Sequence, residues 1–175
     1  PGSAIQIVAA GDGPAAHRAY VRSVSKYAND RIAFLLIDSE QHKEKGLPNW
    51  EFLSQARKLN KPEAAGVDSL GLMVQCMETW FLADREKGIK YFGLPEDGGP
   101  LPKHTEPELV SKSEVLSSFD RAARQIRRRR YQKGQDALAL LGLVDPNVIA
   151  KRCPHAERFF SALRRTSSDE TVRER

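Results

Sequence analysis

The sequence has little cysteine and only short apolar runs. Its two cysteines, Cys76 and Cys153, lie far apart in a chain of 175 residues, which is too few for a disulfide framework or an all-cysteine zinc site. The longest candidate run, Ile32 to Ile37, has six residues, whereas a membrane-spanning helix needs about 20. We therefore expect a cytoplasmic, reduced protein that does not span a membrane.

Motifs of several common enzyme classes are missing as well. There is no P-loop, and Gly11-Asp12-Gly13 is too short for a dinucleotide-binding fingerprint. There is no Gly-x-Ser-x-Gly motif, and the four histidines are scattered without metal-ligand spacing. A Ser/His/Asp or Cys/His enzyme has no positive sign in the sequence, although these absences leave it open.

Positive charge gathers in the C-terminal part of the chain. Residues 1–100 hold 12 Lys and Arg against 13 Asp and Glu (net −1), whereas residues 101–175 hold 16 against 10 (net +6). The excess is concentrated in Arg124, Arg127, Arg128, Arg129, Arg130 and Lys133. Such asymmetry predicts an anionic partner, most often nucleic acid. A solvated helix face, with some arginines paired to nearby acids, is an equally weighted alternative.

Strand and helix patterns alternate in the first half of the chain. Strands are expected at 4–10, 32–37 and 70–75, each followed by a helical pattern, and the middle strand is apolar throughout, as in a parallel sheet covered by helices. The pattern predicts an α/β fold with a small, mainly parallel sheet flanked by helices and a helical C-terminal extension. The expected divisions are an α/β core (4–94), a Pro/Gly-rich loop (95–107), a basic helical extension packed on the core (108–166) and a flexible tail (167–175).

Two acidic residues follow the most apolar strand. Asp38 and Glu40 are two positions apart, so both carboxylates would point to one side if the extended backbone continues. Ligands of open α/β sheets bind at the carboxyl ends of the strands, and paired carboxylates there suit Mg²⁺ or Mn²⁺. The alternative is that Asp38-Ser39-Glu40 is only a turn or a helix start.

The helix expected at 77–92 carries two more acids. Met77, Trp80, Phe81 and Asp84 share one helical stripe, and a carboxylate on such an apolar stripe needs a partner. Glu78 lies near the end of the preceding strand. Asp84 could instead be a surface residue paired with a neighbouring base, and Glu78 could simply stabilise the helix N-terminus.

Three segments carry a family resemblance. They are Leu35-Leu36-Ile37-Asp38-Ser39-Glu40, the stretch Leu72 to Asp84 with its MVQCMETWFLAD core, and Tyr131-Gln132-Lys133-Gly134. Together they resemble a bacterial domain-of-unknown-function family, number four-two-seven-six, which is considered TOPRIM-like. The similarity covers about residues 4–165, and the MVQxMExWxxAD pattern is its most specific part.

The resemblance implies a TOPRIM-type magnesium site. TOPRIM domains occur in topoisomerases, primases and nucleases, where a glutamate after the first strand and an acidic pair after a later strand hold Mg²⁺. By this resemblance Asp38 and Glu40 match the acidic pair, and Glu78 and Asp84 are the family's own helix acids. In the nuclease hypothesis below, Glu78 joins the pair as a metal ligand and Asp84 is a further ligand. Lys112 and Lys133 are the implied phosphate contacts.

One departure from the family concerns the first strand. The family carries a Val-Glu-Gly element there, whereas this chain begins at what resembles the second strand, Ile7-Val8-Ala9-Ala10-Gly11. The resemblance therefore implies that the first-strand glutamate is missing from this chain. The alternatives are that the sequence is truncated, that a separate chain supplies the segment, or that the protein is inactive. Glu78 is a further candidate to replace the missing glutamate.

Three functions follow as hypotheses. The first is a Mg²⁺- or Mn²⁺-dependent nuclease, a hydrolase of DNA or RNA acting in phage defence, with Asp38, Glu40 and Glu78 as catalytic residues. Its nucleic-acid contacts would be Lys112, Arg127, Arg128, Arg129, Arg130 and Lys133. The second is a non-catalytic subunit partnered with an ATPase, and the third is a plain nucleic-acid-binding module. A homodimer is a further expectation.

Overall fold

The computed structural model describes residues 6–27, 32–127 and 129–173, without the side chains of Arg127 and of residues 167–173. The chain divides into two compact units. The first is built from Pro1–Ile37, Glu44–Leu72 and Arg158–Arg175, and the second from Asp38–Lys43 and Met73–Glu157. The chain therefore passes more than once between the units.

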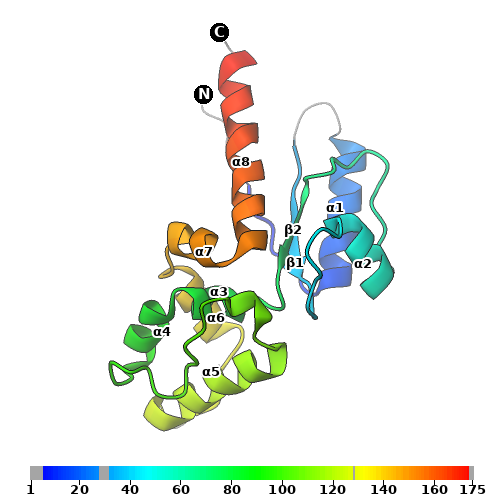
Figure 1. Cartoon of the computed structure of the whole chain (residues 1–175). Helices are drawn as coiled ribbons and strands as arrows, with labels where there is room; N and C mark the ends of the chain where they lie inside the picture. Colours follow the sequence, from blue (N-terminus) through cyan, green and yellow to red (C-terminus); the bar gives the residue numbers. More distant parts are fainter. Residues whose placement is uncertain (1–5, 28–31, 128, 174–175) are drawn as a thin grey trace. The chain divides into compact units, whose positions relative to one another are not determined.

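Two strands and a series of helices make up the described chain (Figure 1). In chain order they are α1 (Gly13–Lys26), β1 (Leu35–Asp38), α2 (Asn49–Arg57), β2 (Leu70–Met73), α3 (Glu78–Ala83), α4 (Arg85–Phe92), the 3₁₀ turn η1 (Pro107–Leu109), α5 (Lys112–Arg127), α6 (Gln135–Leu141), α7 (Pro146–Arg152) and α8 (Pro154–Arg173). No helix of the described chain is both long enough and apolar enough to span a bilayer.

The two strands form a parallel sheet. The Leu35 amide donates to the Ser69 carbonyl (2.8 Å) and the Ser39 amide to the Met73 carbonyl (3.0 Å), so both strands advance in the same direction. Leu35 and Ile37 are buried, as are Leu70 and Leu72. The predicted α/β class with a small parallel sheet and a helical C-terminal part is confirmed.

The strand expected at 4–10 does not form in the part of that segment the structure describes. Residues 6–10 have no regular structure, and Ile7 and Val8 are 90% and 67% exposed; residues 4 and 5 lie outside the described chain. The apolar side chains face solvent there. Local β-propensity therefore did not decide the structure, because a strand also needs a neighbour with which to pair.

The first unit packs helices around its part of the sheet (Figure 1). Asp12 accepts a hydrogen bond from the Ala15 amide (2.8 Å) and caps α1. Tyr20 of α1 is buried, and its hydroxyl is 2.6 Å from Ser69 Oγ beside β2. Trp50 of α2 packs on the ring of Tyr20 with centroids 5.8 Å apart. These contacts hold α1 and α2 to the start of β2.

Gly71 of β2 allows α8 to approach the sheet. A Cβ atom at position 71 would overlap the ring of Phe159, with Cγ only 2.6 Å away. We expect Gly71→Ala to lower the free energy of unfolding by about 1–3 kcal/mol, because the ring must leave its packed position. Urea unfolding followed by circular dichroism measures the change. Gly66→Ala is the control, since its Cβ would meet only Ser69 Cβ at an ordinary 3.8 Å; an equal loss in both variants would contradict the packing argument.

Helix α3 is the centre of the second unit. It contacts α4, α5, α6, α7 and η1, and all six of its residues are buried. Phe81 of α3 and Phe92 of α4 each lie 6.1 Å, centroid to centroid, from Phe119 of α5. This aromatic cluster joins three helices, which fixes α3 and with it the first residue of the helix, Glu78.

The structure corrects two predicted helices. The single helix expected at 77–92 is broken at Asp84, whose backbone (φ −101°, ψ 60°) is not helical and separates α3 from α4. The helical extension was expected to end at residue 166, but α8 continues to Arg173, so residues 167–173 of the expected tail are helical. Residues 174 and 175 lie outside the described chain.

Candidate functional site

Asp38 ends β1 and lies at the carboxyl end of the sheet. Its Oδ1 accepts a hydrogen bond from the Met77 amide (2.9 Å), and its Oδ2 lies 3.2 Å from Lys133 Nζ. The side chain is 15% exposed. Met77 directly precedes α3, so the carboxylate ties the end of one strand to the helix that follows the other. This is the position at which parallel sheets usually bind ligands.

Glu78 is the first residue of α3 and is completely buried. Its Oε1 accepts a hydrogen bond from the Tyr131 hydroxyl (3.3 Å). Its Oε2 has no hydrogen-bond partner and lies 3.8 Å from Lys133 Nζ. A buried carboxylate oxygen without a hydrogen bond is costly. The ammonium of Lys133 is therefore the charge that compensates Glu78 Oε2 in the structure.

Lys133 lies against both carboxylates. Its ammonium is 3.2 Å from Asp38 Oδ2 and 3.8 Å from Glu78 Oε2, and its side chain is 52% exposed. Partial burial opposes its charge, but the carboxylates of Glu78 and Asp38 outweigh burial and raise the pKa of Lys133 above its usual value. The lysine is therefore a cation that neutralises part of the acidic pair.

Two neutral groups complete this cluster. Burial and the charge of Glu78 raise the pKa of Tyr131, so its hydroxyl remains a hydrogen-bond donor to the carboxylate. Burial, together with the Glu78 charge, raises the pKa of Cys76 to about 12. Because the thiolate is the nucleophilic form of cysteine, Cys76 is not a nucleophile at neutral pH.

Glu40 does not point where an extended backbone would send it. Its φ of +69° is left-handed, so the expectation that Asp38 and Glu40 share one side of a continuing strand is wrong. Glu40 is 43% exposed and forms an ion pair with Lys112. Gln75 holds both partners: its carbonyl accepts from the Glu40 amide (2.9 Å) and its side chain from the Lys112 amide (3.1 Å). Glu40 and Lys112 thus form a second acid–lysine pair in this unit.

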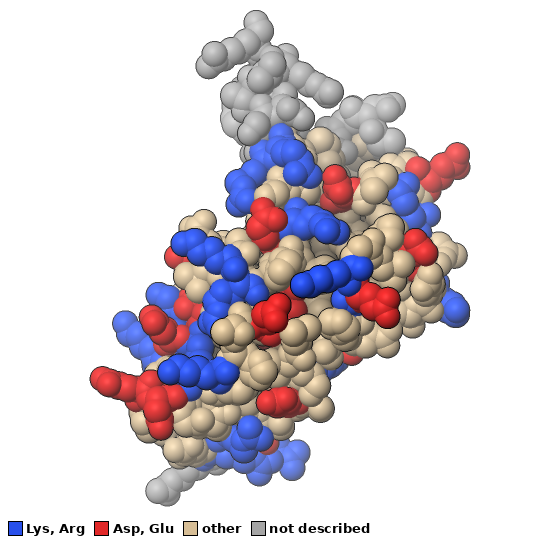
Figure 2. Space-filling view, in the orientation of Figure 1, with Lys and Arg blue, Asp and Glu red and all other residues tan. Residues whose placement is uncertain are grey.

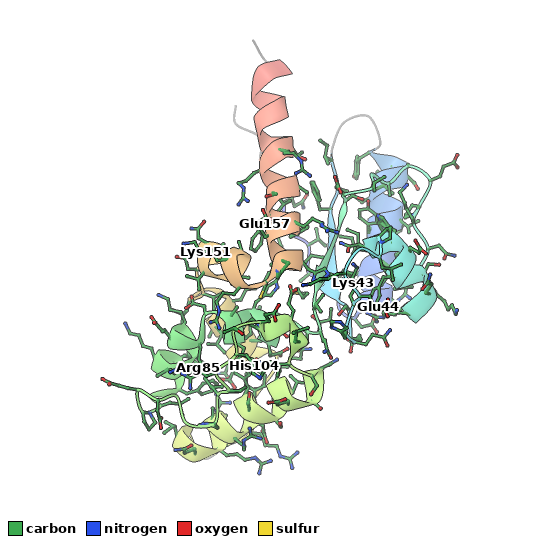
Figure 3. All side chains as sticks on the ribbon, viewed as in Figure 1. Lys43, Glu44, Arg85, His104, Lys151 and Glu157 are labelled. Atoms are coloured by element: carbon green, nitrogen blue, oxygen red, sulfur yellow. The ribbon has the colours of Figure 1, made fainter. Side chains whose placement is uncertain are left out.

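Asp84 has a structural partner. It is buried, and its Oδ2 accepts a hydrogen bond from the Asp145 amide (2.8 Å) just before α7. Next to it, Arg152 of α7 donates to the Ala83 carbonyl (2.6 Å) and to the carbonyl of His104, which is labelled in Figure 3. Asp84 therefore finds the partner that a buried carboxylate requires in the backbone amide of Asp145. This hydrogen bond links the start of α7 to the end of α3.

The arginines at positions 127–130 differ in their partners and in their exposure to solvent. Arg129 donates to both carboxylate oxygens of buried Asp136 (2.7 and 2.6 Å), as the alternative of acid-paired arginines expects. Arg130 is exposed, whereas Arg128 and the side chain of Arg127 lie outside the described residues. On the face drawn in Figure 2, basic and acidic side chains are interspersed. Among the described basic candidates, Lys133 and Arg130 are exposed, whereas the side chains of Lys112 (27%) and Arg129 (29%) are only partly exposed.

Sequence reasoning assigned no role to Tyr131, Gln75 or Lys43. Tyr131 and Gln75 both lie inside the motif segments, and that membership was the available signal. Lys43, labelled in Figure 3, follows the acidic turn and is only 1% exposed. A lysine five residues after Asp38 reads as a surface residue in sequence, and only the packing of the loop reveals its burial.

The described residues contain no group of three or more His, Cys, Asp or Glu side chains placed to hold a metal ion. What the second unit offers is a pair, Asp38 and Glu78, facing one ammonium. Magnesium is commonly held by one or two carboxylates, with water and substrate phosphate completing its coordination. Asp38 and Glu78 provide the two carboxylates that such a magnesium site uses.

Comparison with known proteins gives one match. Residues 8–164 match the family described as Domain of unknown function (DUF4276). No curated protein and no solved structure matches the chain significantly. The matched range includes Asp38, Glu78 and Lys133, as well as the second pair, Glu40 and Lys112.

Proposed function

We propose that this protein, which belongs to the DUF4276 family, is a divalent-cation-dependent enzyme that cleaves phosphodiester bonds of nucleic acid. The observation that carries the proposal is the pairing of Asp38 with Glu78 around one ammonium. The two acids are 40 positions apart in sequence, yet both face Lys133 at the carboxyl end of the sheet.

The residues present fit Mg²⁺ or Mn²⁺. Carboxylate oxygens are the ligands that these hard cations prefer, and Glu78 Oε2 is buried without a hydrogen bond. When bound, the cation polarises the phosphate and activates water. Asp38 and Glu78 are the residues that would hold it. The resemblance of the motif segments also assigns Asp38 to the metal, but it pairs Asp38 with Glu40, which faces Lys112 instead.

The other side chains of the cluster act on the substrate and on the ligands. Tyr131 donates to Glu78 Oε1 and thereby orients the carboxylate. Lys133 and Lys112 carry charges that reach solvent and can bind backbone phosphates of DNA or RNA. Gln75 holds the backbone of both Glu40 and Lys112, which positions the second lysine.

A plain nucleic-acid-binding role is the second candidate. It is favoured by the neutralisation of the acids: Glu40 faces Lys112, and Asp38 and Glu78 face Lys133. In that case the carboxylates only position lysines that bind phosphate, and no metal is required.

Cleavage assays distinguish the two functions. We expect the protein to cut plasmid, single-stranded DNA or RNA in MgCl₂ or MnCl₂ and not in EDTA. Asp38→Asn should lower the rate by roughly 100-fold or more, because a metal interaction is worth several kcal/mol in the transition state. Glu63→Gln, an exposed acid of the first unit, is the matched control. Binding without cleavage in any metal would favour the second candidate, and full activity of Asp38→Asn would remove the proposed site.

A further inference from the structure

Lys133 occupies a place that the proposed function gives to a metal ion. Its ammonium contacts the same two carboxylates, Asp38 at 3.2 Å and Glu78 at 3.8 Å. Lys133 therefore offers a single ammonium to two carboxylates. Glu78 Oε2 also lacks a hydrogen bond, although its residue is completely buried. The lysine thus compensates the acidic pair incompletely.

The acids and the lysine differ in their freedom to move. Glu78 lies on a helix held by the packing of the second unit, and Asp38 is tied to the Met77 amide. Lys133 is half-exposed and lies in the segment before α6, next to Gly134, where a Cβ atom would meet nothing within 4 Å. The carboxylates are therefore fixed, whereas the lysine side chain has room to turn away.

We propose that Lys133 is an exchangeable internal cation, which a divalent ion displaces from Asp38 and Glu78 and which then binds a nucleic-acid phosphate. This inference rests on the proposed function and adds a coupling between its two ligands. A divalent ion neutralises both carboxylates by itself, so the ammonium loses its attraction to the pair and is repelled by the ion. Displaced toward solvent, it becomes available to an anion.

The exchange has a consequence that a simple phosphate-binding lysine would not have. If Lys133 competes with the metal, removing its charge must strengthen metal binding while it weakens nucleic-acid binding. A lysine that contacted phosphate without competing for these carboxylates would leave the metal affinity unchanged. The opposite signs of the two effects identify the exchange.

Calorimetric titration of the whole chain with MnCl₂ tests this directly. We expect Lys133→Gln and Lys133→Met to bind Mn²⁺ roughly tenfold more tightly than the unaltered protein, a typical size for coupling between two ligands. Binding of a short single-stranded DNA in CaCl₂ should weaken in the same variants. Lys87→Gln, an exposed lysine of α4, controls for the loss of one positive charge, and thermal unfolding verifies that each variant is folded.

The outcomes separate this inference from the proposed function. Tighter Mn²⁺ binding by both Lys133 variants, with no such gain in Lys87→Gln, supports the exchange even if no substrate is cleaved. Unchanged or weaker Mn²⁺ binding by folded Lys133 variants overturns the exchange, while metal-dependent cleavage by the unaltered protein would still stand. Absence of Mn²⁺ binding in every variant overturns both.

Discussion

Asp136→Ala is expected to lower the free energy of unfolding by about 3 kcal/mol, because it removes the acceptor of a buried charged network. Asp136 is completely buried and accepts hydrogen bonds from Arg129, from the Tyr91 hydroxyl (2.7 Å) and from the Gln132 amide (2.8 Å). Without the carboxylate these donors lose their common acceptor. The segment that carries Tyr131 and Lys133 lies between Arg129 and Asp136, so the site should loosen as well.

The same network predicts a dependence on pH. Burial opposes the charge of Asp136, but its hydrogen bonds from Arg129 and the Gln132 amide lower the pKa of the carboxyl from 3.8 to about 2. A depressed pKa in the folded state contributes stability that is present above the unfolded value and disappears as the pH falls toward the folded value. The stabilisation should therefore be complete above about pH 5 and decline between about pH 4 and pH 2.

Urea unfolding at a series of pH values measures both effects. The gap in unfolding free energy between the unaltered protein and either Asp136→Ala or Asp136→Asn should be constant near neutrality and should narrow below about pH 4. Glu96→Ala, an exposed acid in the loop after α4, is the control and should change stability by no more than about 0.5 kcal/mol. A gap that widens in acid would contradict the assignment of Asp136 as an ionised acceptor.

Glu78→Gln is expected to abolish most metal-dependent cleavage. If Glu78 holds the metal as proposed, the loss of its charge should cost about 4 kcal/mol of transition-state stabilisation, which is roughly a thousandfold in rate. Glutamine keeps the shape of the side chain and can still accept a hydrogen bond from Tyr131. The substitution thus removes the charge that faces Lys133 while it retains the contact that orients the side chain.

Initial rates in MnCl₂, compared with the thermal midpoint of each variant, separate chemistry from folding. A rate that falls while the midpoint stays within a few degrees would support a catalytic role for Glu78. Glu63→Gln should match the unaltered protein in both measurements. If Glu78→Gln cleaves at the normal rate, Glu78 is a structural acid that balances Lys133, and the proposed metal pair is wrong.

The proximity of Asp38 and Glu78 could be predicted from sequence because each acid comes shortly after an apolar strand. A run of apolar residues that ends in Asp38, and a second that leads into Glu78, predict two acids at one edge of a parallel sheet, and the structure places both residues against one lysine. Strand order and direction suffice for that inference. The break at Asp84 and the left-handed backbone of Glu40 could not be read in the same way, because hydrogen bonds to distant segments accompany both.

The sequence alone determined the α/β class, the apolar strands and the acids that follow them, since hydrophobic periodicity and chain order are local properties. Only the tertiary structure decided which cation meets which acid. Lys133 is 95 residues from Asp38 in the chain, and Arg129, its neighbour in the basic run, turns to Asp136 instead. Arg129 and Lys133 are four positions apart and look equivalent in sequence. In the structure Arg129 is paired with the buried Asp136, whereas Lys133 faces Asp38 and Glu78.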